Sequence, residues 1–135
     1  PETILGAAEL RDTVDLTRPV ALSLGAVLQL IPDKADPYRL LAALVDALPA
    51  GSYLTLTHLT ADLAPQESGQ LVEVCRQWGI PTSPRSRAEV ERFVAGLQLV
   101  DPGVVVAHRW RPGNAGQDGP ADRDVSVYAA VARKP

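Results

Sequence analysis

The stretch RPVALSLGAVLQLIPDKADP, residues 18–37, decides the fold class. Its first half, PVALSLGAVL (19–28), is a continuous apolar run of strand length, which is typical of a strand buried on both faces in a parallel sheet. Its second half ends in Asp36-Pro37, the pattern of an N-cap followed by proline at the first helical position. The stretch therefore predicts a buried strand that leads into a helix.

The segments that follow continue the alternation of strands and helices. The predicted order is a helix over 2–10, the strand over 19–28, a helix over 38–49, a strand over 52–60, helices over 62–79 and 87–96, a bent strand over 97–110, a polar loop over 111–123 and a final strand over 124–134. The first part is a βαβ pattern, which requires a parallel, right-handed crossover, and the last two strands form an antiparallel hairpin. The fold class is α/β, with helices packed around a mostly parallel sheet.

Composition limits the range of functions. The 135 residues fit one domain, and a net charge of −3 with both signs scattered gives no basic footprint for nucleic acid. No apolar run approaches the ~20 residues that span a bilayer, and no signal peptide is visible, so we expect no membrane partner and a cytoplasmic location. The single Cys75 excludes an internal disulfide framework, and the two histidines are not spaced as metal ligands.

Four segments carry a resemblance to a known family: residues 18–37 as quoted, LVDALPAGSYLTLTHLTAD (44–62), PRSRAEVERFVAGLQLVDPGVVVAHRWRP (84–112) and DVSVYAAVARKP (124–135). In them the chain resembles the C-terminal half of a class I S-adenosylmethionine-dependent methyltransferase, of a family common in actinobacteria and formerly described as a domain of unknown function. The resemblance implies a Rossmann-like sheet that ends in an antiparallel β-hairpin, with its last strand inserted beside its neighbours, and S-adenosylmethionine as cofactor. The family's Gly-rich turn is not in this sequence. Residues 1–135 are therefore expected to form one partial domain that lacks the N-terminal cofactor-binding half.

The resemblance places the end of the first strand at the ligand. In open α/β sheets, ligands bind beyond the carboxyl ends of the strands, where the strand order reverses. Gly25 would let the backbone approach the cofactor, and Ala26 and Val27 are small enough to line an adenosyl pocket. Gln29 would point an amide at the methyl acceptor, although the family more often has histidine there and an amide is no general base. The alternatives are that Gly25 only relieves crowding and that Gln29 only satisfies a buried carbonyl group.

The next strand contributes three further candidates. His58 lies near its carboxyl end, where a histidine could orient or deprotonate an acceptor, and Thr60 and Asp62 could hydrogen-bond a substrate. The alternative is a buried histidine with satisfied hydrogen bonds, and an Asp62 that caps the following helix. Arg85, Arg87 and Arg92 cluster near a helix start and are interpreted as a solvated face.

Two function classes remain open. The first is a methyltransferase acting on a small molecule or natural product, of which this chain is a fragment that is inactive alone. The second is a non-catalytic methyltransferase-like domain that binds a ligand or regulates. In either case, we expect the exposed edge of the first strand to pair with the missing N-terminal half or with a second copy of the chain.

Overall fold

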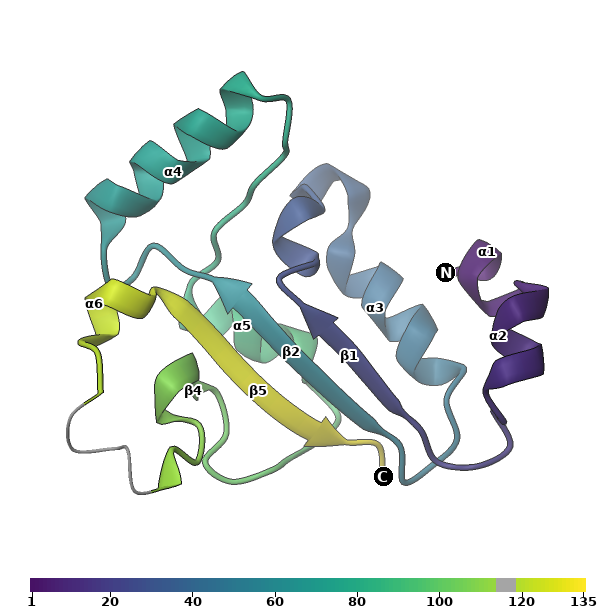
Figure 1. The fold of residues 1–135 in the computed structure, drawn as a ribbon. Helices are drawn as coiled ribbons and strands as arrows, with labels where there is room; N and C mark the ends of the chain where they lie inside the picture. Colours follow the sequence, from purple (N-terminus) through teal and green to yellow (C-terminus); the bar gives the residue numbers. More distant parts are fainter. Residues whose placement is uncertain (114–118) are drawn as a thin grey trace.

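The computed structural model describes residues 1–113 and 119–135, so part of the predicted loop 111–123 lies outside the described residues. The elements before the sheet's second strand are α1 (Glu2–Leu5), α2 (Ala8–Thr13), β1 (Ala21–Gly25), the 3₁₀ turns η1 (Leu28–Leu30) and η2 (Asp33–Ala35), and α3 (Pro37–Asp46). The remaining elements are β2 (Tyr53–Leu59), α4 (Pro65–Gln77), α5 (Arg87–Phe93), β3 (Gln98–Leu99), β4 (Val105–Val106), the 3₁₀ turn η3 (Ala107–Arg109), α6 (Asp122–Val125) and β5 (Val127–Arg133). Figure 1 shows their arrangement.

One strand of the sheet runs against all the others. The strand order is β1-β2-β5-β3, with β4 also paired to β5, and β1 pairs parallel with β2. β5 is antiparallel to β2, β3 and β4, so the other four described strands point the same way. The mixed α/β class and the inserted antiparallel last strand are thereby confirmed.

The helices follow the predicted capping chemistry. Asp36 accepts a hydrogen bond from the backbone N–H of Arg39 at 3.1 Å, and Pro37 begins α3. Ser86 and Glu89 exchange side-chain and backbone hydrogen bonds in a capping box at the start of α5. These signals are local, and for this reason the starts of both helices could be predicted to within a residue.

Two predicted elements are broken where the backbone turns, and a third is shorter than predicted. The helix over 2–10 becomes α1 and α2, and the bent strand over 97–110 becomes β3 and β4 on either side of a turn at Gly103, whose φ is +84°. The final strand starts later than predicted, at Val127, because residues 122–125 form one helical turn instead.

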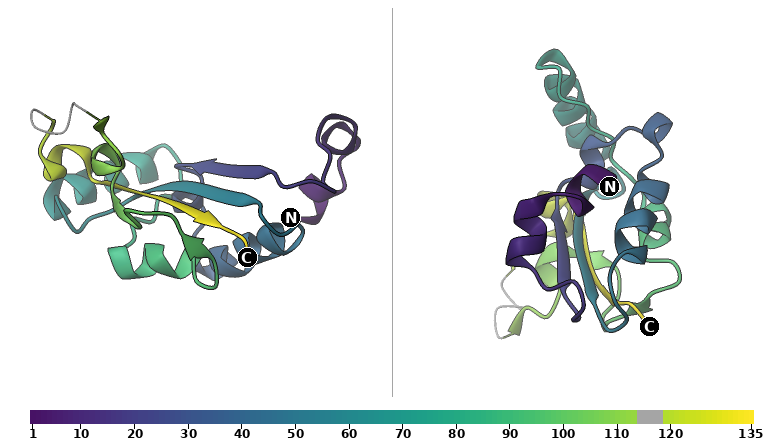
Figure 2. Two further views of the ribbon diagram at one scale, coloured as in Figure 1. Left: turned by 90° about the horizontal axis from the view of Figure 1, so that it is seen from below. Right: turned by 90° about the vertical axis from the view of Figure 1, so that its right-hand side faces the viewer.

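The two faces of the sheet differ. Helices α3 and α5 lie against one face, as the edge-on view shows (Figure 2), and the buried core forms between them and the sheet. The core residues are Leu28, Leu41, Leu54, Leu56, Val90, Phe93, Val94, Val104, Val106, Tyr128, Ala130 and Ala132. The opposite face, here called the open face, consists of Ala21, Ser23, Gly25, Tyr53, Thr55, Thr57, Ala129 and Val131, which are half-buried or exposed. The prediction that the first strand is buried on both faces is therefore wrong for the described residues, because α3 and α5 cover one face, whereas α1 and α2 lie only beside the start of β1 (Figure 2).

Helix α4 stands apart from the sheet, beyond the carboxyl ends of β1 and β2 (Figures 1 and 2). Leu71, Val74 and Trp78 on it are exposed. No helix in the described part of the chain is long and apolar enough to cross a membrane.

Candidate functional site

The carboxyl end of β1 carries an unusual backbone conformation. Ala26, which follows the last residue of the strand, has a φ of +55°, in the left-handed region that residues other than glycine rarely adopt. Its N–H is held by Thr57 of β2, with 3.2 Å to the carbonyl oxygen and 3.0 Å to Oγ1. A residue in this conformation costs free energy and persists only where the surrounding structure maintains it, and such residues cluster at functional sites. Gly25, Ala26 and Val27 are all exposed, so this predicted cofactor-binding segment faces solvent.

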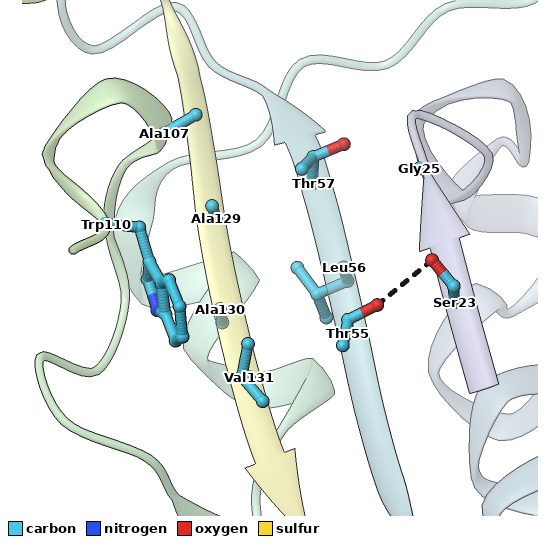
Figure 3. A pocket seen from close by; sticks show the side chains of 10 residues that line it. All are labelled: Ser23, Gly25, Thr55, Leu56, Thr57, Ala107, Trp110, Ala129, Ala130 and Val131. Atoms are coloured by element: carbon cyan, nitrogen blue, oxygen red, sulfur yellow. Dashed lines mark hydrogen bonds between the residues drawn. The ribbon is translucent and has the colours of Figure 1, made fainter. Parts of the chain in front are cut away.

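Behind this segment, the open face forms a shallow hollow of about 290 Å³. Figure 3 shows Gly25 at one end of the hollow, the Ser23 and Thr55 hydroxyls joined by a hydrogen bond of 3.0 Å, and Trp110 lying beside β5 at the other side. Most of the residues that line the hollow have small side chains, so its floor is the surface of the sheet itself. The large side chain of Trp110 forms one side. The position of the hollow places the cofactor-binding candidates at the rim of a mostly apolar surface.

Gln29 is engaged within the protein. Its side-chain Oε1 accepts a hydrogen bond of 2.8 Å from the backbone N–H of Leu59, and its main-chain carbonyl oxygen accepts another of 2.8 Å from the backbone N–H of Ser83. The side-chain amide thus links the segment after β1 to the end of β2. This fits the alternative in which Gln29 only satisfies a buried backbone group, although that group is an N–H and not a carbonyl. An Oε1 that already accepts a backbone bond serves to tie the two strand ends together.

His58 is fully buried on the helix-covered face and does not share the open face with Gly25. Its Nε2 lies 3.0 Å from a guanidinium nitrogen of Arg85, which can only donate, so Nε2 is the acceptor and the ring proton is on Nδ1. Nδ1 donates to the carbonyl oxygen of Leu59 at 2.8 Å, and the ring stacks on Phe93 at 5.7 Å. The predicted proton transfer by His58 does not fit these surroundings, because both ring nitrogens are occupied by protein groups. The structure places His58 as a buried, neutral link.

The burial of His58 predicts a pH-dependent stability. Burial, reinforced by the charge of Arg85, lowers the pKa of His58 below its ordinary value, against the opposing effects of the Leu59 carbonyl group and Glu89. The unfolded chain therefore takes up a proton at a pH where the folded chain does not, and the stabilisation is complete above pH ~6.5 and lost as the pH falls toward the folded-state pKa. We expect the free energy of unfolding to drop by about 1.4 kcal/mol per pH unit below pH ~6.5.

Urea denaturation between pH 7.5 and 5.5 measures this slope, since most carboxylates titrate below that range. The matched control is His58→Gln, which keeps an acceptor near Arg85 but does not titrate, and its unfolding free energy should vary less with pH. Equal slopes for the two proteins would show that His58 is not the group responsible.

Thr60 and Asp62 differ in their access to solvent. Thr60 is fully buried, with its Oγ1 accepting from the backbone N–H of Asp62 at 3.0 Å, so its predicted contact with substrate does not fit its position. Asp62 is exposed, and its Oδ2 accepts from the N–H of Arg87 at 2.8 Å and from the hydroxyl of Tyr128 at 3.0 Å. Asp62 thus binds the first turn of α5 and not the next helix along the chain. Of the three candidates in and after β2, only Asp62 has a side chain exposed to solvent and so accessible to a ligand.

Arg85 is the residue that sequence reasoning misplaced. Arg87 is exposed and pairs with Glu91 at 3.0 Å, as a solvated face would, but the Arg85 side chain is only 3% exposed. No sequence pattern could have found it, because Arg85 and Arg87 both flank the N-cap Ser86 and the partners that bury Arg85 are 27 or more residues away along the chain.

The strand order, with an antiparallel last strand inserted between parallel strands, is that of the class I methyltransferase fold. The N-methyltransferase NodS from Bradyrhizobium japonicum WM9, crystallised with S-adenosyl-L-homocysteine, shares this fold with a TM-score of 0.50 and 16% identity over 85% of this chain and 45% of its own. The S-adenosyl methyltransferase family model matches residues 1–135, and the chain belongs to this family. No curated protein matches the chain in sequence.

Two solved structures are much more similar. A DUF574 family protein from Streptomyces avermitilis MA-4680 is 46% identical over the whole chain, with a TM-score of 0.96. A protein from Thermobifida fusca YX is 31% identical over 99% of the chain, with a TM-score of 0.87. The chain spans 52% and 50% of the lengths of these two proteins, so it corresponds to about half of each.

The residues present fit one side of the family's cofactor, S-adenosylmethionine. A side-chain carbon added at Gly25 would meet nothing closer than Thr57 Oγ1, at 4.0 Å, so the backbone there is open to a ligand. The small side chains of Ala26 and Val27 continue this open segment. The family's Gly-rich cofactor-binding turn is not among the 135 residues, so these residues would hold only part of the cofactor.

Proposed function

We propose that this chain is the C-terminal half of an S-adenosylmethionine-dependent methyltransferase that acts on a small molecule or natural product. The observation that carries the proposal is the exposed segment Gly25–Val27, held in a left-handed turn by Thr57 at the carboxyl end of β1. That is the end of an open α/β sheet at which ligands bind. The scattered charges and the net charge of −3 support a small-molecule acceptor over a nucleic acid.

The half that would complete the enzyme would dock at the outer edge of β1 and on the open face beside it. β1 is an edge strand of the described sheet, and the open face beside it is half-exposed, with Tyr53 at 41% exposure. A completing half that paired with β1 would cover this face and bring its cofactor-binding turn beside Gly25. Catalysis would then consist mainly of holding the acceptor in line with the sulfonium methyl group. Alone, residues 1–135 would hold only one side of the cofactor and be inactive.

Calorimetric titration with S-adenosyl-L-homocysteine tests this proposal. The product of the complete reading frame that encodes residues 1–135 should bind, and the 135-residue chain alone should not. Gly25→Leu in the complete product should weaken binding about tenfold or more, because the new side chain projects into the ligand edge without disturbing the fold. The matched control is Gly69→Leu, on the exposed side of α4, which should leave binding unchanged. Absence of binding, or equal binding by both variants, would contradict the proposal.

A non-catalytic ligand-binding or regulatory domain is the second candidate. It is favoured by one observation, the engagement of both ring nitrogens of His58 in internal hydrogen bonds, which leaves no free ring nitrogen to move a proton, while the Gln29 amide cannot act as a base. The coding sequence upstream of Pro1 separates the candidates. An intact Gly-rich turn followed by an acidic ribose ligand favours the enzyme, and degenerate residues at those positions favour the regulatory role.

A further inference from the structure

A buried arginine, Arg85, is bonded to the segment that follows the candidate site. The Arg85 guanidinium is placed near the rings of Tyr38 and Phe93, at 5.9 and 5.5 Å from their centres. A buried guanidinium is costly unless its N–H groups find acceptors, so the identity of those acceptors indicates what the residue does.

Three of the four acceptors belong to one short segment that follows β1. The guanidinium donates to the carbonyl oxygens of Leu28 at 3.1 Å and Ile31 at 3.0 Å, and to Oδ1 of Asp33 at 2.6 Å. The fourth acceptor is Nε2 of His58 in β2. A planar guanidinium offers its donors in a fixed geometry, so bonds to several points of one segment fix that segment's conformation.

The anchored segment continues directly from the candidate cofactor-binding residues. Only Ala26 and Val27 separate the end of β1 from Leu28, so the position of residues 28–33 sets the direction in which the chain leaves the left-handed turn. The main chain of Arg85 adds a further tie, because its N–H donates to the carbonyl oxygen of Leu59 at 3.1 Å. Arg85 itself lies on the helix-covered side and reaches solvent only through Asp33, whose side chain is 79% exposed.

We infer that Arg85 is a positioning residue, which holds segment 28–33 against the end of β2 and thereby keeps Gly25–Val27 in the conformation that receives the cofactor. This inference rests on the proposed function. His58 acts with Arg85 as the acceptor that orients the guanidinium, and Asp33 closes the arrangement at the surface. None of the three contacts the ligand.

The test compares variants of the complete reading-frame product by titration with S-adenosyl-L-homocysteine. Arg85→Lys keeps the charge but cannot reach four acceptors from one nitrogen, so the dissociation constant should rise about tenfold or more. Arg87→Lys, an exposed arginine two residues away, should leave it unchanged. Leu54→Ala is the control for lost stability, because Leu54 is buried near the amino end of β2, where it pairs with Leu22 of β1, and it should leave binding unchanged at temperatures where the variant is folded.

A second readout does not depend on ligand. Nitrogen-15 NMR of the histidine rings should show Nδ1–H and an accepting Nε2 for His58, and Arg85→Lys should shift the Nε2 resonance together with the amide resonances of residues 26–33. Binding by Arg85→Lys within twofold of the unchanged protein, or unchanged resonances in that segment, would overturn the inference. Absence of binding by the unchanged protein would instead contradict the proposed function, and the NMR comparison would then decide the positioning role alone.

Discussion

Replacing Arg85 with methionine is expected to lower the free energy of unfolding by about 3–5 kcal/mol, since each buried acceptor left without a donor costs about 1–3 kcal/mol. The carbonyl oxygens of Leu28 and Ile31 and Nε2 of His58 would lose their donor, whereas Asp33 is exposed and would be solvated. Methionine has nearly the same length, so the loss reports the hydrogen bonds more than the packing. Urea denaturation of the 135-residue chain and of the variant at pH 7.5 measures the difference, at protein concentrations low enough that both are monomeric.

The matched control is Arg87→Met. Arg87 makes an exposed ion pair with Glu91 on α5, and such pairs contribute about 0–1 kcal/mol. A loss of less than 1 kcal/mol for Arg85→Met would mean that water replaces the guanidinium as donor. The hydrogen bonds of Arg85 would then contribute little to the free energy of unfolding.

The second large effect concerns the edge of the sheet. The 135-residue chain alone is expected to self-associate through β1. Tyr53 donates to the carbonyl oxygen of Val20, and Ala26 donates to that of Thr57, so alternate residues of β1 face β2. The N–H groups of Ala21, Ser23 and Gly25 therefore point to the outer edge, where they can pair with another chain.

Ser23→Pro removes one of these edge donors without removing a bond to β2, and it should restore a monomer. Ser23→Ala is the control, because it loses the 3.0 Å bond from the Thr55 hydroxyl but keeps the N–H, and it should still associate. Sedimentation velocity over a range of concentrations measures the outcome. A monomeric 135-residue chain at high concentration would refute the prediction.

The order of elements could be predicted because its signals are local. The apolar run at 19–28, the Asp36-Pro37 cap and the capping box from Ser86 to Glu89 each depend on a few neighbouring residues. The exposed face of β1 could not be predicted, because an apolar run shows that burial is favourable but not what provides it. The breaks after α1 and β3 depend on turns that periodicity does not detect.

The site was harder to predict for a related reason. Gly25, Ala26 and Val27 were placed at the ligand-binding end of β1 by the resemblance to the methyltransferase family, and the structure leaves all three exposed. The roles of His58 and Arg85 depend on each other across 27 residues of chain, and no single-sequence pattern encodes such a contact. The left-handed conformation of Ala26 also depends on a distant partner, Thr57, and alanine gives no hint of it.

The place of β5 in the sheet has a consequence for how the protein is made. β5 is the last described strand in sequence, yet it lies between β2 on one side and β3 and β4 on the other. A ribosome delivers residues 53–59 long before residues 127–133, so β2 must wait for its antiparallel neighbour while about half of the 135 residues are being synthesised. During that interval, the nascent chain exposes both a strand edge and the apolar residues meant for the core, which is the state that chaperones bind and that aggregates.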